Sequence, residues 1–176
     1  DCANVESNPD VKLLSQPSTG IDYVGMNTQK EKFSDKRVRQ AINYALDKQA
    51  FVDTIIEGRG LVANSYINAA IPGWTDEVEA YPYDPEKAKE LLAEAGYPDG
   101  FECSIFVNGD LRTRSAQILQ AQLADVGIKV DISTYEWGAG PTRALIRTEV
   151  PISYSIPEIM VQPETAHSSQ MTRLMS

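Results

Sequence analysis

The amino-acid sequence predicts an α/β domain organised around a βαβ unit. Residues 101–107 and 128–134 alternate apolar and polar side chains as strands do, and residues 112–126 between them repeat apolar side chains at helical spacing. The 176 residues are 42% hydrophobic and 23% charged, which is the composition of an ordinary globular chain. We therefore expect the two strands to be parallel, joined by a right-handed crossover, within a mixed sheet.

The amino-terminal part predicts little regular structure before one better strand. A turn precedes a short strand at residues 11–14, and a loop follows it to Gly20. Residues 21–27 then alternate bulky apolar with small or polar side chains, which indicates a strand.

Two helices are predicted next, arranged as a hairpin. The first begins at Ser34 or Asp35, and Asp47 caps the second, which covers residues 48–57. The apolar face of the first helix is expected to be buried. It consists of Val38, Ala41, Ile42, Ala45 and Leu46.

A long ordered loop is expected from residue 59 to residue 83, because this stretch shows no sustained periodicity and contains several prolines and glycines. Asp84 and Pro85 then suit the N-cap and first turn of a helix over residues 85–95. We expect Leu92 on the inward face of that helix.

Charge and residue inventory exclude several functional classes. A net charge of −9 disfavours nucleic acid as a partner, and no apolar run is long enough for a membrane-spanning segment. His167, the single histidine, lies in a polar tail, and no nucleotide-binding or metal-binding motif occurs. We therefore expect no enzyme activity, no cofactor and no metal. Cys2 and Cys103 could form a disulfide, but the sequence leaves their pairing open.

Three blocks of sequence, in order, carry a family resemblance. They are Tyr23–Thr28 with Phe33–Lys48, then Tyr81–Tyr97, then Gln120–Trp137. Together they resemble the second lobe of the family 5 extracellular solute-binding proteins, the dipeptide-, oligopeptide- and nickel-binding components of ABC importers. The resemblance implies one lobe of a type II periplasmic-binding-protein-like fold that captures peptides or small solutes for a membrane permease. It also implies a bacterial protein that is periplasmic, or extracellular and lipid-anchored.

The resemblance further implies a fragment with three parts. Residues 1–20 correspond to a remnant of the first lobe or to a hinge crossing, residues 21–139 to the second-lobe domain, and residues 140–176 to a divergent proline-rich tail. The family's acidic segment that pairs with the amino end of a bound peptide has no counterpart here. In its absence, Glu158 and Glu164 in the tail are candidate replacements.

Three residues are candidates for the ligand-binding cleft. Asn27, Asn108 and Trp137 each stand at the end of a predicted strand, where a binding lobe presents polar and aromatic groups. Structural roles are equally compatible with the pattern, with the two asparagines as turn residues and the tryptophan as a core anchor. An alternative function is a stand-alone protein-interaction domain, in which the tail supplies a new binding surface.

Overall fold

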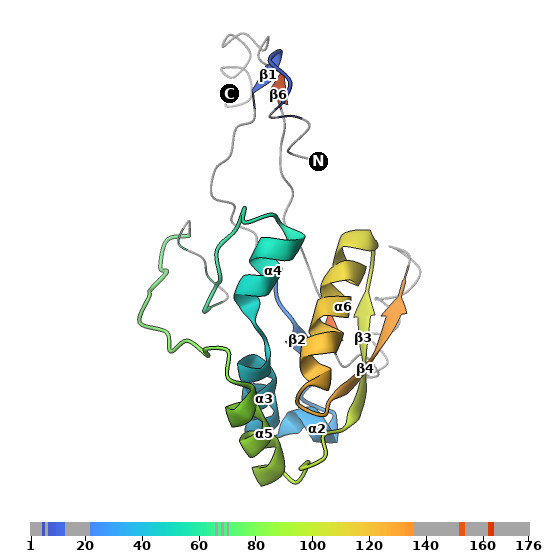
Figure 1. The fold of residues 1–176 in the computed structure, drawn as a ribbon. Helices are drawn as coiled ribbons and strands as arrows, with labels where there is room; N and C mark the ends of the chain where they lie inside the picture. Colours follow the sequence, from blue (N-terminus) through green and yellow to red (C-terminus); the bar gives the residue numbers. More distant parts are fainter. Residues whose placement is uncertain are drawn as a thin grey trace. The chain divides into compact units, whose positions relative to one another are not determined.

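The structure, a computed structural model, contains the predicted helices and strands together with elements that were not predicted (Figure 1). It describes residues 5, 7–12, 22–65, 67, 69, 71–135, 152–153 and 162–163. The described elements, in chain order, are β1 Val11–Lys12, β2 Gly25–Met26, α2 Glu31–Ser34, α3 Lys36–Ala45, α4 Lys48–Ile55, α5 Pro85–Glu94, β3 Glu102–Val107, α6 Asp110–Ala124, β4 Lys129–Thr134, β5 Ile152–Ser153 and β6 Gln162–Pro163.

The chain divides into two compact units. Residues 20–156 form one unit, and residues 1–19 together with residues 157–176 form the other. Within the smaller unit, β1 pairs with β6 in antiparallel orientation. Strand β6 lies in the predicted proline-rich tail and was not predicted, because it is created by long-range pairing that the local sequence does not encode. The predicted division into residues 1–20, 21–139 and 140–176 stays a prediction.

The predicted βαβ unit is confirmed. Strands β3 and β4 pair in parallel, with Glu102 opposite Lys129 and Val107 opposite Thr134. The intervening helix α6 begins two residues earlier than predicted. Its first turn contains exposed side chains that give no inward apolar signal. Gly127, whose φ is 87°, separates the end of this helix from β4.

The predicted inward face of α3 is buried along its whole length. The helix begins as predicted, because the Asp35 carboxylate accepts a hydrogen bond from the backbone N–H of Arg37 at 2.8 Å. The short helix α2, which places Phe33 in the core, precedes it and was not predicted.

The predicted hairpin of α3 and α4 is wrong. Helix α3 packs against α5, and α4 packs against α6. The two linking residues, Leu46 and Asp47, have extended backbone conformations, so the chain continues away from α3 rather than folding back along it (Figure 1). The Asp47 cap itself is present, since its carboxylate accepts from the backbone N–H of Ala50 at 3.1 Å.

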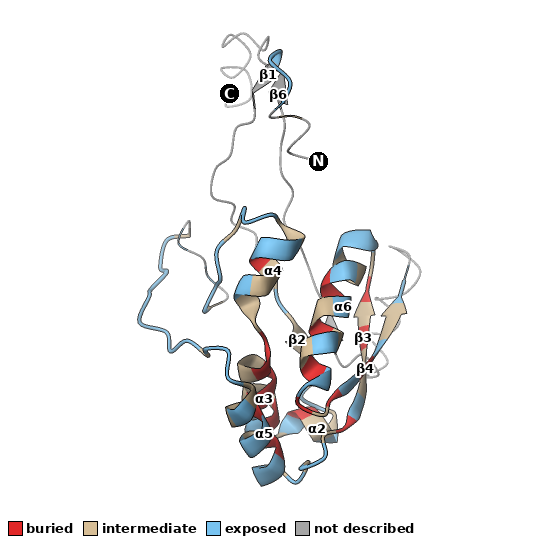
Figure 2. Cartoon of the chain, viewed as in Figure 1, coloured by how far each residue is buried: buried red, intermediate tan, exposed pale blue. Residues whose placement is uncertain are grey.

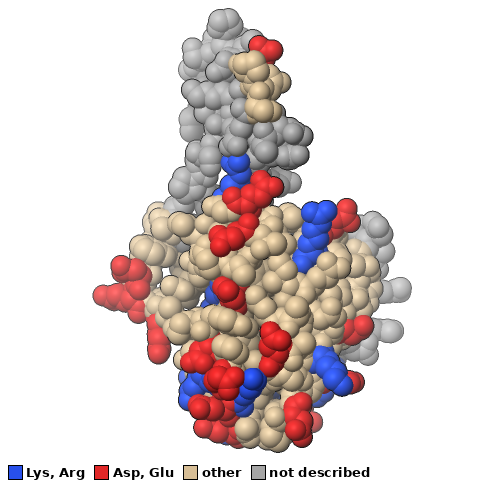
Figure 3. Space-filling model, in the orientation of Figure 1, with Lys and Arg blue, Asp and Glu red and all other residues tan. Residues whose placement is uncertain are grey.

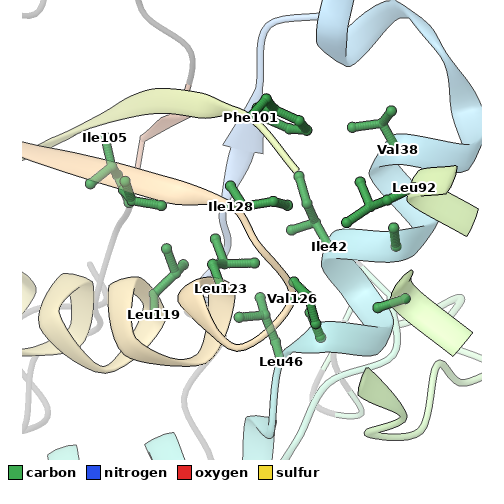
Figure 4. Close-up of a cluster of buried hydrophobic side chains, with 14 of the residues drawn as sticks. Val38, Ile42, Leu46, Leu92, Phe101, Ile105, Leu119, Leu123, Val126 and Ile128 are labelled. Atoms are coloured by element: carbon green, nitrogen blue, oxygen red, sulfur yellow. The ribbon is translucent and has the colours of Figure 1, made fainter. Parts of the chain in front are cut away.

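A single hydrophobic core joins the helices to the parallel strands. Leu119 and Leu123 of α6 point toward the β3–β4 pair, and Ile42 and Leu92 approach from α3 and α5 (Figure 4). Figure 2 shows that the buried residues lie where these elements face one another. This core gives the unit a rigid platform on which the strand ends are positioned.

The strand predicted at residues 21–27 is reduced to the two residues of β2. It pairs in antiparallel orientation with β5, Gly25 opposite Ser153 and Met26 opposite Ile152. Parallel and antiparallel pairs therefore both occur within residues 20–156.

The described part of the loop over residues 59–83 contains no helix or strand, as predicted. Most of the described residues in this loop are exposed to solvent (Figure 2). The carboxyl end of the loop is anchored, because the Tyr81 ring packs edge-on against Tyr44 and the Lys48 ammonium donates to the Tyr81 carbonyl at 3.2 Å. Asp84 then caps α5, as predicted, by accepting from the backbone N–H of Lys87.

Candidate ligand-binding site

The carboxyl end of β3 brings two polar side chains together. The strand ends at Val107, and Asn108 and Gly109 turn the chain into α6. From the first turn of this helix, the Arg112 guanidinium donates through Nη1 to the Asn108 side-chain oxygen at 2.7 Å. Asn108 is half-buried, and its side-chain oxygen orients the Arg112 guanidinium. Because a guanidinium has five N–H donors, other donors of Arg112 are left for a further partner.

Asp22 contributes an opposite charge near this arginine. Burial raises the pKa of the Asp22 carboxyl to about 6, and the positive charge of Arg112 counteracts part of that rise. Within the described part of the chain, the buried Oδ1 of Asp22 and the buried Nε of Arg112 have no hydrogen-bond partner. Unsatisfied buried polar atoms are costly, and they commonly mark places that a ligand or water completes.

Asn27 does not join this cluster. It follows β2, and its side-chain oxygen accepts from the backbone N–H of Gln29 at 3.0 Å, which closes a local turn. Shortly after this turn, Lys32 donates to the carbonyl of Glu102 at the start of β3. Asn27 therefore lies toward the start of β3 and Asn108 at its end. The third candidate, Trp137, lies outside the described residues.

A groove beside β2 was missed by the sequence analysis. It has a volume of about 380 Å³ and lies next to α3. Its polar helix residues lie on the face of α3 opposite the buried one, and only the position of β2 turns that face into one wall of a groove. The lining residues are Val24, Met26, Thr28, Lys36, Arg39, Gln40, Asn43 and Tyr81.

The described residues contain no cluster of histidine, cysteine, aspartate or glutamate that could hold a metal ion. Cys103 carries a free thiol, and burial raises its pKa to about 11, so it is a poor nucleophile at neutral pH. Cys2 and His167 lie outside the described residues. No helix in the described part of the chain has the length and apolar character needed to cross a membrane.

The fold and sequence together define the class of protein. A family model described as bacterial extracellular solute-binding proteins, family 5 Middle, matches residues 1–153. The chain belongs to this family, as the resemblance of the three sequence blocks predicted. The predicted fold class is also confirmed, because solved periplasmic binding proteins share the architecture.

Individual relatives are binding proteins. The chain is 41% identical over 150 residues to heme-binding protein A of Haemophilus influenzae and 37% identical over 151 residues to the dipeptide-binding protein of Escherichia coli K12. Each alignment covers 82% of this chain, and the chain spans only 27% and 28% of the two relatives. A solved structure of the ABC transporter-associated periplasmic binding protein DppA from Helicobacter pylori, in complex with the peptide STSA, matches with a TM-score of 0.78 and 34% identity. That match covers 88% of this chain and 30% of DppA.

Proposed function

We propose that this chain contributes one lobe of the substrate-binding component of a bacterial ABC importer. The complete protein would capture peptides or similar small solutes and deliver them to a membrane permease. The observation that carries the proposal is the match, at a TM-score of 0.78, of the β3–α6–β4 platform and its helices to a peptide-bound relative associated with an ABC transporter. The 37% identity to a dipeptide-binding protein supports the same solute class.

The location of the proposed solute contact follows from the fold. In open α/β folds, ligands bind beyond the carboxyl ends of strands, where loops present polar groups. Asn108 and Arg112 occupy this position after β3, and the guanidinium is already oriented by the Asn108 amide at 2.7 Å. We propose that these two side chains contact the solute. For Asn27 and Trp137, a ligand contact stays a prediction without further support.

The proposed function also implies where the complete protein is located and that it binds its solute without chemical conversion. Family 5 solute-binding proteins are periplasmic or extracellular in bacteria. We propose that a lipid anchor holds the complete protein at the cell surface if its host has no outer membrane. The relatives are binding proteins rather than enzymes, and we assign this chain no catalytic step.

The first test is calorimetry of the 176-residue chain with a pool of di- to pentapeptides. A small-molecule site normally buries most of the ligand, and the chain spans little more than a quarter of its curated relatives. We expect no affinity tighter than about 1 mM, because a single lobe leaves one face of the ligand in water. A saturable micromolar isotherm would contradict the two-lobed site and favour a stand-alone interaction domain, with Glu158 and Glu164 as the first residues to replace.

The second test places the lobe in a complete relative. Residues 22–135 replace the matching segment of the E. coli dipeptide-binding protein, and cooperative melting confirms that the chimera folds. We expect dipeptide binding, and we expect Arg112→Gln in the chimera to weaken it about tenfold or more, since truncating a charge that contacts a buried ligand costs at least that much.

Lys89→Gln is the matched control for this variant, because Lys89 lies on an exposed face of α5 and pairs with Glu86 of the same helix at 2.9 Å. A folded chimera without dipeptide binding would contradict the proposed solute class. Equal effects of the two substitutions would remove Arg112 from the site.

A further inference from the structure

The charged side chains among the described lining residues of the groove between β2 and α3 are all positive. Lys36 and Arg39 line it, and none of the described lining residues is an aspartate or glutamate, although the whole chain has a net charge of −9. Acidic side chains are spread over the face of the molecule seen in Figure 3. The acid that acts on Arg39 is Asp35, and its carboxylate is itself paired with the Arg37 guanidinium at 2.6 Å. Such a lining attracts anions.

The groove also has an apolar floor and a fixed aromatic wall. Met26 of β2 and Val24, which directly precedes this strand, are partly buried and pack against the hydrophobic core. Tyr81 forms the wall, and its ring is held edge-on by Tyr44 at 5.2 Å between ring centres, with the Lys48 ammonium 5.8 Å from the centre of the Tyr81 ring. These contacts exist without a ligand, so the apolar surface is already formed.

The two cations differ in mobility. Arg39 donates through Nη1 to the carbonyls of Phe33 and Ser34, both at 2.8 Å, which fixes its guanidinium beside the end of α2. Lys36 is exposed and forms no hydrogen bond or ion pair within the described residues. One anchored and one adjustable cation can therefore bind the same anionic group.

The spacing along α3 sets the length of a matching ligand. Lys36 and Asn43 are seven residues apart, which corresponds to about 10 Å along the helix axis at 1.5 Å per residue. Asn43 lies at the Tyr81 end, because the neighbouring residue Tyr44 contacts the Tyr81 ring. The cationic end and the aromatic end of the groove are thus separated by about the length of a medium-chain carboxylate.

We propose that this groove is a second binding site, which takes an elongated organic monoanion. The carboxylate of the ligand would lie between Lys36 and Arg39, and its apolar body would cover Val24 and Met26 and end against Tyr81. The site shares no residue with Asn108 and Arg112, so the inference does not depend on the proposed solute-binding function.

Titration of the full chain with octanoate, followed by calorimetry and by amide chemical shifts, tests the site. We expect saturable binding in the range of about 0.1–1 mM, with shift changes concentrated in residues 24–28 and 36–43. The neutral analogue 1-octanol should bind at least about threefold more weakly, because it cannot pair with the two cations.

Substitutions then separate this site from general surface binding. Lys36→Gln should weaken octanoate binding at least about threefold, since an exposed charge pair contributes up to about 1 kcal/mol, which corresponds to about fivefold. Lys89→Gln removes an equivalent charge on α5 and should leave the affinity unchanged. Arg112→Gln should also leave it unchanged, because that residue belongs to the other site.

Four results would overturn the proposal. The first is no saturable binding up to 10 mM octanoate, a concentration about tenfold above the weakest expected dissociation constant. The second is equal affinity for octanoate and 1-octanol, and the third is equal weakening by Lys36→Gln and Lys89→Gln. Shift changes confined to residues outside β2 and α3 would locate the ligand elsewhere and would overturn it as well.

Discussion

The βαβ segment and the loop over residues 59–83 are nearly neighbours in sequence, but they differ in how their structure is maintained. In the βαβ segment, each turn of α6 after the first and alternate residues of β3 contribute to a common core. Leu119, Leu123 and Ile105 are among them (Figure 4). In the described part of the loop, Leu61, Ile67 and Trp74 are all exposed, with Leu61 at 92% exposure. The loop is fixed mainly at its end, through Tyr81.

This difference shows where the stability of the domain resides. Burial of apolar surface and a continuous strand ladder stabilise the βαβ segment along its length, whereas the loop depends on a few contacts at one end. Substitutions should therefore have large effects in and around the βαβ core and small effects in the loop.

The largest expected effect is at Leu92, which is 1% exposed in the core shared with the βαβ segment. Leu92→Ala should lower the free energy of unfolding by about 2–5 kcal/mol, because it removes apolar contacts and leaves a cavity. Urea denaturation followed by circular dichroism measures this loss. A change below about 0.5 kcal/mol would indicate that the core is not shared as described.

Two glycines with positive φ provide the next comparison. A Cβ at Gly100, beside β3, would collide with the backbone carbonyl of Gly127, whereas a Cβ at Gly73 in the loop would meet no atom within 4 Å. Gly100→Ala should cost more than about 2 kcal/mol, and Gly73→Ala about 1 kcal/mol, from backbone strain alone. Thermal melting of both variants tests this order, and equal losses would remove the proposed difference between the regions.

Asp22 tests whether the Asn108–Arg112 end of the βαβ segment is less stable than its core. Its pKa is raised to about 6 in the folded state from 3.8, so the folded chain binds this proton more tightly than the unfolded chain. Stability should fall as the pH rises from about 4 to 6 and remain lower above that range.

Asp22→Asn should remove this dependence and should raise stability at pH 7 by on the order of 1 kcal/mol, a value reduced for a side chain that remains half exposed. Urea titrations at pH 4 and pH 7 are the measurement. If the free energy of unfolding changed with pH in the same way for the unsubstituted chain and for Asp22→Asn, the buried Asp22 carboxylate would not destabilise the fold.

The smallest effect is expected at Leu61. Leu61→Ala should change the free energy of unfolding by less than about 0.5 kcal/mol, because the side chain is almost fully exposed. The same denaturation experiment used for Leu92→Ala provides the matched measurement. A loss above 1 kcal/mol would show that the loop contributes to the core after all.

Local patterns predicted the cores of the elements better than their packing partners. The buried face of α3 and the caps at Asp47 and Asp84 follow from local side-chain chemistry, so they could be predicted directly. The start of α3 was left between Ser34 and Asp35, and the structure gives Asp35 as its cap. The helix against which α3 packs could not be predicted in this way. Two residues with extended backbone conformations decide whether α4 folds back along α3 or continues away from it. Likewise, the pairing of β1 with β6 joins residues about 150 positions apart.

The candidate site shows the same division. Sequence reasoning selected Asn108 from its position after a strand, and it placed Asn27 in the same group because both follow strands. Only the tertiary structure separates them, since β2 ends near the start of β3, where Lys32 reaches the Glu102 carbonyl. Arg112 was passed over because a charged side chain in the first turn of a helix is ordinarily solvated.

By itself, the sequence determined the α/β class, the parallel βαβ unit, the caps at Asp47 and Asp84, and the family. Apolar periodicity and the residues that cap helices or form turns act over a few positions, so they can be recognised locally. The tertiary structure alone decided which surfaces meet. It brought Asp22 near Arg112, and it placed β2 beside α3 so that a polar helix face became the wall of a groove. These contacts depend on chain segments that are distant in sequence, and no local preference specifies them.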